Sequence, residues 1–314
     1  MTPAMWAPIL AAVVLAPAGS RLGRRLPPSV SVPLLTLAAL ATAVATGFVL
    51  AVAAFDAMAM LGPVAALGHW SVASVRPGGT VSIMLDVAAG LIVGVLLAAA
   101  VRRATRIGVD LGHAVATCRR LGPDAGGLVV LRDDEPDAFA LPGVRGRVVV
   151  STGMLRMLPP DERRVLLAHE RAHLAHGHQV YVQLAGLAAA ANPLLRPLAR
   201  EVERGVERWA DEVAAAEVGD RRLAARALAR AGLARAKSPV DSRPGLALHA
   251  AAERGGVGAR AMALLQPPPR RRRWPAAALI VVTLVAIGGA ALTGSTTEDR
   301  FERAQADYAL ALAR

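Results

Sequence analysis

The sequence predicts a mostly helical α+β chain in which four transmembrane helices flank one water-soluble domain. Apolar residues make up 54% of the 314 positions, above the roughly 45–50% that is usual for a soluble domain. Most of the excess lies in four long apolar runs, and short β-rich segments occur only between the third and the fourth run. We therefore expect three spans within 1–101, a soluble domain over 102–273, and a fourth span with a short tail over 274–314.

The first apolar run, residues 5–19, has a small-residue stretch at 16–18 that resembles a signal-peptide cleavage site. No basic residue precedes the run and three arginines follow it, the reverse of the charge order in a signal peptide, so we interpret it as a short first span. The other spans are expected at about 31–55, 81–101 and 275–294, each long enough for about 30 Å of hydrocarbon. Asp86 lies in the third, near one end, and both a functional and a water-exposed role remain open for it.

Ten arginines flank the apolar runs: Arg21, Arg24, Arg25, Arg102, Arg103, Arg106, Arg270, Arg271, Arg272 and Arg273. By the positive-inside rule, loop 18–30 and the domain 102–273 face the cytoplasm, whereas the N-terminus, loop 56–80 and the tail 295–314 lie outside. This pattern indicates a multi-pass protein of the bacterial plasma membrane and accounts for the net charge of +12. No nucleic-acid module or interleaved aromatics accompany the arginines, so we expect no direct nucleic-acid partner.

The region 102–273 has the make-up of an α+β domain. Strands are expected in "GGLVVLRDD" (126–134), "DAFAL" (137–141) and "GRVVVST" (146–152), and helices over 158–177 and 201–236. The apolar run 180–199 is interpreted as a buried or membrane-surface helix, and 237–273 as a loose tether to the last span. Cys118, the only cysteine, excludes a disulfide within the chain and is expected to be an apolar filler.

The stretch "LLAHERAHLAHGH" at 166–178 holds four of the seven histidines. On a helix His169 and His173, four apart, project from one face, where two imidazole nitrogens can bind one ion. Glu170 then lies beside the ion, placed to take a proton from the water that the ion activates. This is the HExxH arrangement of zinc proteases. The alternative is an amphipathic helix with solvated histidines.

A hydrolytic zinc site needs three protein ligands and one open position. His176 is too far along the helix, about 10.5 Å from His169, and His178 is expected to face the opposite side. In "ERWADE" (207–212) the acids Glu207 and Asp211 are four apart, so that one can bind the metal while the other supports a ligand histidine. The alternative is a solvated acidic stripe paired with neighbouring arginines.

The strand–turn–strand–helix order from 128 onward, together with the E-x-x-A-D element at Glu207, resembles membrane-embedded gluzincin proteases over about 128–215. Two families share it: bacterial beta-lactam sensor-transducers of the BlaR/MecR type, and the heat-shock or prenyl-peptide membrane zinc proteases. The resemblance implies a zincin-like fold and one Zn²⁺ ion bound by His169, His173 and Glu207. It also implies Glu170 as general acid/base and Asp211 as the acid that orients a ligand.

Three spans before the zinc domain and one after it resemble the sensor-transducers, which implies cleavage of a cytoplasmic repressor as a protein substrate. Those proteins carry a penicillin-binding domain after the last span, where only about twenty residues follow here, so we do not expect direct beta-lactam sensing. The alternatives are a quality-control or peptide-maturing membrane protease and a catalytically idle transmembrane signalling scaffold. The oligomeric state is left open.

A substrate is expected to lie in extended form against the edge strand at 137–141, with Phe139 in the core. His178, Tyr181 and His249 are the candidates for a second oxyanion donor, and each is equally well a packing or surface residue.

Overall fold

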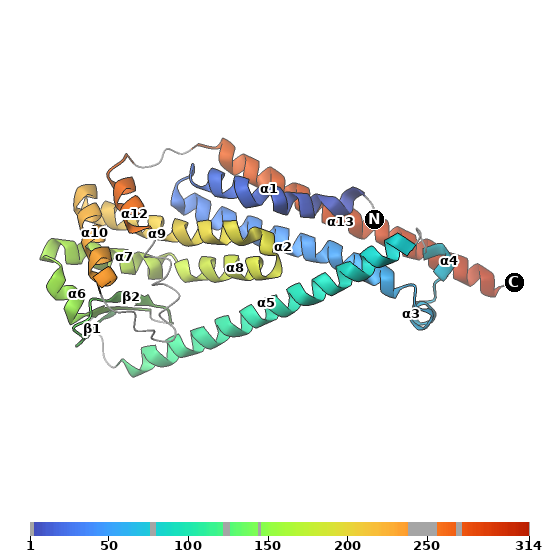
Figure 1. Ribbon diagram of the computed structural model, residues 1–314, viewed down its shortest axis with the longest axis horizontal. Helices are drawn as coiled ribbons and strands as arrows, with labels where there is room; N and C mark the ends of the chain where they lie inside the picture. Colours follow the sequence, from blue (N-terminus) through green and yellow to red (C-terminus); the bar gives the residue numbers. More distant parts are fainter. Residues whose placement is uncertain are drawn as a thin grey trace.

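The computed structural model describes residues 3–75, 80–121, 126–143, 146–237, 256–267 and 272–313. The molecule is elongated (Figure 1). A bundle of long helices forms its centre, a domain with a small sheet forms one end, and the C-terminus lies at the other end. The mostly helical α+β architecture predicted from the sequence is confirmed.

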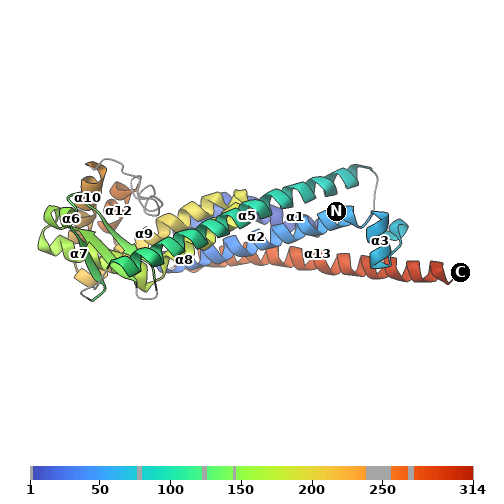
Figure 2. The same cartoon turned by 90° about the horizontal axis from the view of Figure 1, so that it is seen from below.

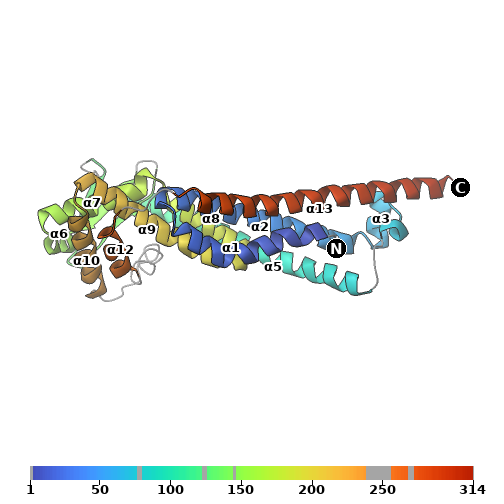
Figure 3. The ribbon, with the colours of Figure 1, turned by 90° about the horizontal axis from the view of Figure 1, so that it is seen from above.

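Four helical segments are long and apolar enough to cross a bilayer, as the sequence predicts: Pro3–Gly23, Pro28–Met58, Met84–Arg120 and Trp274–Leu312. The first comprises the short helix η1 (Pro3–Met5) and α1 (Trp6–Gly23), and the second is α2. The third belongs to α5 (Thr80–Arg120), and the fourth is α13. All four run along the long axis of the molecule, as Figures 2 and 3 show.

Two of these helices continue well past the ends expected for their spans. Helix α5 runs to Arg120 rather than 101, and α13 runs to Leu312, so that the expected tail after 294 is helical. No proline lies within 102–120 or 295–312, and alanine, arginine and glutamate favour continued helix. The apolar run thus predicts the part of each helix that can lie in the hydrocarbon core of a bilayer, but not where the helix ends.

The far end of α13 packs against the short helices α3 (Gly62–Gly68) and α4 (Val72–Val75). The Trp70 ring lies 5.0 Å from the Phe301 ring, and Arg300 forms an ion pair with Asp56 at the end of α2. The backbone N–H of Ser71 donates to the carbonyl of Ala304 at 3.0 Å. These contacts fix the helical extension to the loop between α2 and α5.

The three predicted strands are confirmed as β1 (Leu128–Leu131), β2 (Ala138–Leu141) and β3 (Arg147–Ser151). They form a sheet of order β1-β3-β2, in which β3 pairs parallel with β1 and antiparallel with β2. Strand β2 is therefore an edge strand. Phe139 is half-buried and packs against a cluster of Val129, Leu141 and Val149, as expected of a core residue.

Two helices follow the sheet directly. The Ser151 hydroxyl caps α6 (Thr152–Met157) by accepting a hydrogen bond from the N–H of Met154 at 3.0 Å. Helix α7 (Pro160–Ala175) begins at a proline, carries two acids in its first turn, and packs against β2 and β3. It ends before Gly177, whose φ of 60° is accessible to glycine at little cost.

The apolar run 180–199 forms a helical hairpin rather than a fifth span. Helix α8 (His178–Ala191) and α9 (Arg196–Val218) are joined by the turn η2 (Pro193–Leu195), and both pack against α2. With 14 residues, α8 is about 21 Å long, too short for about 30 Å of hydrocarbon. The side-chain oxygen of Asn192 caps the turn by accepting from the N–H of Leu194. The hairpin ties the soluble domain to the membrane helices.

After α9 the chain forms α10 (Arg221–Lys237) and, beyond the undescribed residues 238–255, helix α12 (Val257–Leu264). The expectation of a loose tether over 237–273 is wrong for α12, which packs against α10 and α9. Leu264 is buried in a cluster with alanines of both helices. One buried apolar side chain in eight residues is too weak a helical pattern to detect beside prolines and glycines.

Helix α9 approaches α2 closely at Gly205. A Cβ atom at Gly205 would lie 2.7 Å from Cγ2 of Val32, closer than two carbon atoms tolerate. Because Glu207 is two residues further along α9, this contact also sets the position of its side chain.

We expect Gly205→Leu to force α9 away from α2 and to lower the free energy of unfolding by about 1–3 kcal/mol, the usual cost of overpacking. The matched control is Gly47→Leu on α2, because a Cβ there meets nothing within 4 Å. Denaturant unfolding in detergent measures both variants. Equal stability of the two would show that the contact at Gly205 imposes no constraint.

Candidate metal centre

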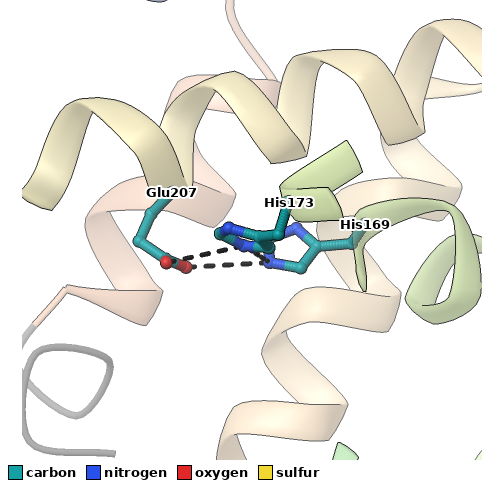
Figure 4. Close-up of side chains that lie close together, drawn as sticks. All are labelled: His169, His173 and Glu207. Carbon is teal, nitrogen blue, oxygen red and sulfur yellow. Dashed lines mark hydrogen bonds and ion pairs between the residues drawn. The ribbon is translucent and has the colours of Figure 1, made fainter. Parts of the chain in front are cut away.

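Helix α7 presents His169 and His173 one turn apart, and their rings turn toward each other (Figure 4). The two Nε2 atoms lie 3.1 Å apart. His169 is buried and His173 is partly buried, which argues against the alternative of solvated histidines on an amphipathic helix. The helix thus supplies two adjacent imidazole nitrogens to one point in space.

Helix α9 brings the carboxylate of Glu207 to the same point. Its Oε2 lies 3.7 Å from Nε2 of His169, and its Oε1 lies 3.6 Å from Nε2 of His173. Among the described residues, these three form the group of His, Cys, Asp and Glu side chains that is close enough to hold a metal ion. Glu207 and His169, which are 38 positions apart in the sequence, therefore lie close together, as predicted.

The geometry of these donor atoms fits a zinc ion. Tetrahedral zinc with ligand distances of about 2.0–2.1 Å separates its donor atoms by about 3.3 Å. The two imidazole nitrogens lie 3.1 Å apart, and each lies 3.6–3.7 Å from a different oxygen of Glu207. Oε2 of Glu207 is buried and makes no hydrogen bond of acceptable geometry, although Nη1 of Arg260 lies 2.9 Å away. Two imidazoles with one carboxylate are a donor set typical of catalytic zinc.

Asp211 lies behind His169. Its Oδ1 is 3.1 Å from Nδ1 of His169, the ring nitrogen that faces away from Glu207. A carboxylate in this position fixes the ring orientation and makes the imidazole a stronger donor to a metal. The orienting role that the resemblance implies for Asp211 requires a carboxylate at this position.

Arg260 of α12 joins the two acids. Its Nε and Nη2 each lie 2.7 Å from an oxygen of Asp211, a bidentate pair, while Nη1 reaches Glu207. The side chain of Arg260 is only 10% exposed. A buried guanidinium that bridges two carboxylates holds both of them in fixed positions.

Glu170 is buried, 4% exposed, next to His169 on α7. Its negative charge helps to raise the pKa of His169. Within the described part of the chain, the centre therefore contains the three carboxylates of Glu170, Glu207 and Asp211 against the guanidinium of Arg260. Negative charge exceeds positive charge, which favours a bound cation.

The protonation of the centre reflects the same charge excess. Burial alone lowers the pKa of His169, but its interactions with Asp211 and Glu207 and the negative charges of Asp211 and Glu170 outweigh burial and raise that pKa to about 10. Burial raises the pKa of Glu207 and of Asp211, yet His169 and Arg260 together hold both pKa values below the usual range. Both acids are thus ionised, as metal binding by Glu207 requires.

The expectation that His178 faces away from the site is wrong. Gly177 turns the chain so that His178, the first residue of α8, lies behind His173, with 3.1 Å between their Nδ1 atoms. A continuous helix through 178 would have put it on the other side, but the helix ends at Ala175. Burial lowers the pKa of His178 to about 4, so the ring is neutral.

The other candidates lie apart from the three donor groups. His176 is exposed and stacks on Trp209, with ring centroids 4.8 Å apart, and Tyr181 lies 6.2 Å from the same indole. His249 falls outside the described residues. Asp86 is buried within α5 rather than open to water.

Sequence reasoning missed Arg260 and the position of His178. Arg260 sits among many arginines in a glycine-rich stretch, and no spacing rule relates it to residues 49 positions earlier. For His178 a signal was present, since Gly177 permits the left-handed turn that ends the helix.

The family comparison covers His169 and His173 but ends before Glu207. Residues 112–188 match the model of Peptidase family M48. The chain is 45% identical over 58 residues to a "Protease HtpX homolog" of Janthinobacterium sp. (strain Marseille), covering 18% of this chain and 20% of that protein. It is 38% identical over 82 residues to a protein of the same name in Herminiimonas arsenicoxydans, covering 26% and 27%. The chain thus spans about a fifth to a quarter of these relatives. No solved structure matches.

Replacing Arg260 with glutamine removes the guanidinium that bridges the buried carboxylates of Glu207 and Asp211. We expect the free energy of unfolding of the zinc-free protein to fall by about 3–5 kcal/mol, and by less when zinc is bound, because the ion supplies positive charge. Denaturant titrations with and without zinc measure both values. The control is Arg222→Gln at an exposed position of α10. An unchanged stability of the zinc-free Arg260→Gln protein would contradict this role.

Zinc binding should release a proton from His169. Because the pKa of His169 in the zinc-free centre is raised to about 10, this ring is protonated at pH 8 and must lose its proton to bind. Calorimetry in buffers of different ionisation enthalpy should give one proton from His169 and up to one more from the metal-bound water, and affinity should increase at least tenfold per pH unit while His169 is protonated. Release of no more protons than the metal-bound water supplies would show that the ring is already neutral.

Proposed function

We propose that the chain is a zinc-dependent endopeptidase of the bacterial plasma membrane that hydrolyses peptide bonds of a protein or peptide substrate. The observation that carries this proposal is the convergence of His169, His173 and Glu207 within metal-binding distance. The match of residues 112–188 to Peptidase family M48 and the two relatives described as proteases support it.

In this mechanism His169, His173 and Glu207 hold one Zn²⁺ ion, which when bound supplies Lewis acidity and makes hydroxide available near neutral pH. Glu170 takes a proton from the attacking water and delivers it to the leaving amine. Asp211 and Arg260 keep His169 and Glu207 in position. The buried position of Glu170 beside His169 supports catalysis, because a purely structural metal site needs no base beside its ligand.

We further propose that the centre faces the cytoplasm. The arginine-rich ends of the candidate spans lie on its side of the bundle. Arg24, directly after α1, donates to Glu201 of α9 at 3.2 Å, and Arg103 of α5 donates to Gln183 of α8 at 2.6 Å. Arg25 also lies over the ring of Trp274 at the start of α13. Basic residues at one end of all four helices are typical of the cytoplasmic side.

For the substrate we propose an extended peptide that adds to the edge strand β2. This strand is at the edge of the sheet and α7 packs beside it.

Regulated cleavage of a cytoplasmic protein such as a repressor is the proposed biological role. A general quality-control or maturing protease is the second candidate, favoured by relatives that are described as proteases and not as sensors.

The test is Glu170→Gln, which removes the base but keeps the shape of the side chain. We expect the variant in detergent to bind one zinc ion like the unaltered protein and to cleave an unfolded protein such as casein about 10²–10⁴-fold more slowly, the usual contribution of general acid–base catalysis. The control is Glu217→Gln on α9, at an exposed position. Full activity of Glu170→Gln would contradict the mechanism, and a catalytically idle scaffold would show no zinc-dependent cleavage in either protein.

A further inference from the structure

The outer nitrogens of the two histidines, those that face away from Glu207, have different partners. Nδ1 of His169 meets the carboxylate of Asp211 at 3.1 Å. Nδ1 of His173 meets a ring nitrogen of another histidine, His178, at the same distance. A metal-binding histidine usually donates its second N–H to a carboxylate, a carbonyl or water, so the second pair is unusual.

We infer that His178 is the positioning residue for His173, accepting through its Nδ1 a hydrogen bond from Nδ1–H of His173. This inference rests on the proposed metal centre. His173 directs Nε2 toward Glu207 and His169, so that nitrogen must be unprotonated to bind zinc. A neutral imidazole carries its proton on the other nitrogen, hence Nδ1 of His173 is the donor and Nδ1 of His178 the acceptor.

The surroundings of His178 restrict its ring to this orientation. The residue is 1% exposed, at the start of α8 directly after the turn at Gly177. Its ring lies 4.9 Å from the ring of Trp209 and 4.8 Å from that of His173. Trp209 is two residues after Glu207 on α9, so the helix that supplies the carboxylate also packs the residue that orients His173.

A neutral acceptor suits this position for an electrostatic reason. Glu170, Glu207 and Asp211 already place three negative charges around the centre, against one positive charge on Arg260. A fourth carboxylate behind His173 would raise the cost of folding the zinc-free protein, because like charges in a buried site repel. An imidazole accepts the hydrogen bond without adding charge.

Two substitutions of His178 by side chains of nearly equal shape distinguish the loss of the hydrogen bond from a change in packing. In His178→Asn, Oδ1 is bonded to Cγ as Nδ1 is in histidine, so an acceptor stays near the same place. In His178→Leu, a methyl group takes that place and no acceptor remains. Three quantities are measured for each protein in detergent: zinc affinity by competition with a chelator, the visible spectrum of the cobalt(II) form, and the unfolding midpoint without metal.

We expect His178→Asn to bind zinc within about threefold of the unaltered protein and to keep its cobalt spectrum. His178→Leu should bind zinc about 10–100-fold more weakly, the usual effect of removing such a partner, with an altered cobalt spectrum and a metal-free unfolding midpoint close to that of His178→Asn. Unchanged zinc affinity of His178→Leu, or equal losses in both variants, would overturn the inference. If His178→Leu does not fold, the test rests on His178→Asn, and weakened zinc binding by that variant would overturn the inference. Failure of the unaltered protein to bind zinc would instead remove the proposed function.

Discussion

The distance between α7 and α9 is the constraint on which the centre depends. The two histidines come from one helix and are adjacent whatever surrounds them, whereas Glu207 reaches them only because α9 passes alongside α7. Helix α9 is held on its other side by α2, through the close approach at Gly205, and at its base by the pairing of Glu201 with Arg24. The membrane helices thus set the position of the third donor group.

The charges at the centre follow from the same packing. Three buried carboxylates near two imidazoles are unfavourable in a medium of low dielectric constant, and Arg260 compensates only part of their charge. The rest is met by a proton on His169 in the zinc-free protein, as its raised pKa shows. A divalent cation that displaces this proton gives the buried acids a stronger partner, so metal binding and folding are linked.

Most elements were predictable because their signals are local. Apolar runs reveal α1, α2, α5 and α13, and alternating β-rich segments reveal the strands. The four-residue spacings place His169 with His173 on one face of α7, and Glu207 with Asp211 on one face of α9. What escaped prediction depends on tertiary contact. Arg260 lies in a helix that forms mainly by packing on α9 and α10, and His178 changes sides because a glycine ends the helix two residues earlier than helical periodicity suggests.

X-ray absorption spectroscopy at the zinc edge, on the purified chain with its metal content determined, tests the centre most directly. We expect one zinc per chain, with only nitrogen and oxygen neighbours at about 2.0–2.1 Å and the outer-shell scattering of two imidazole rings. Loss of the metal on Glu207→Ala should accompany this result. A zinc-free protein, a sulfur neighbour from Cys118, or a spectrum unaffected by the loss of Glu207 would contradict a site built from α7 and α9.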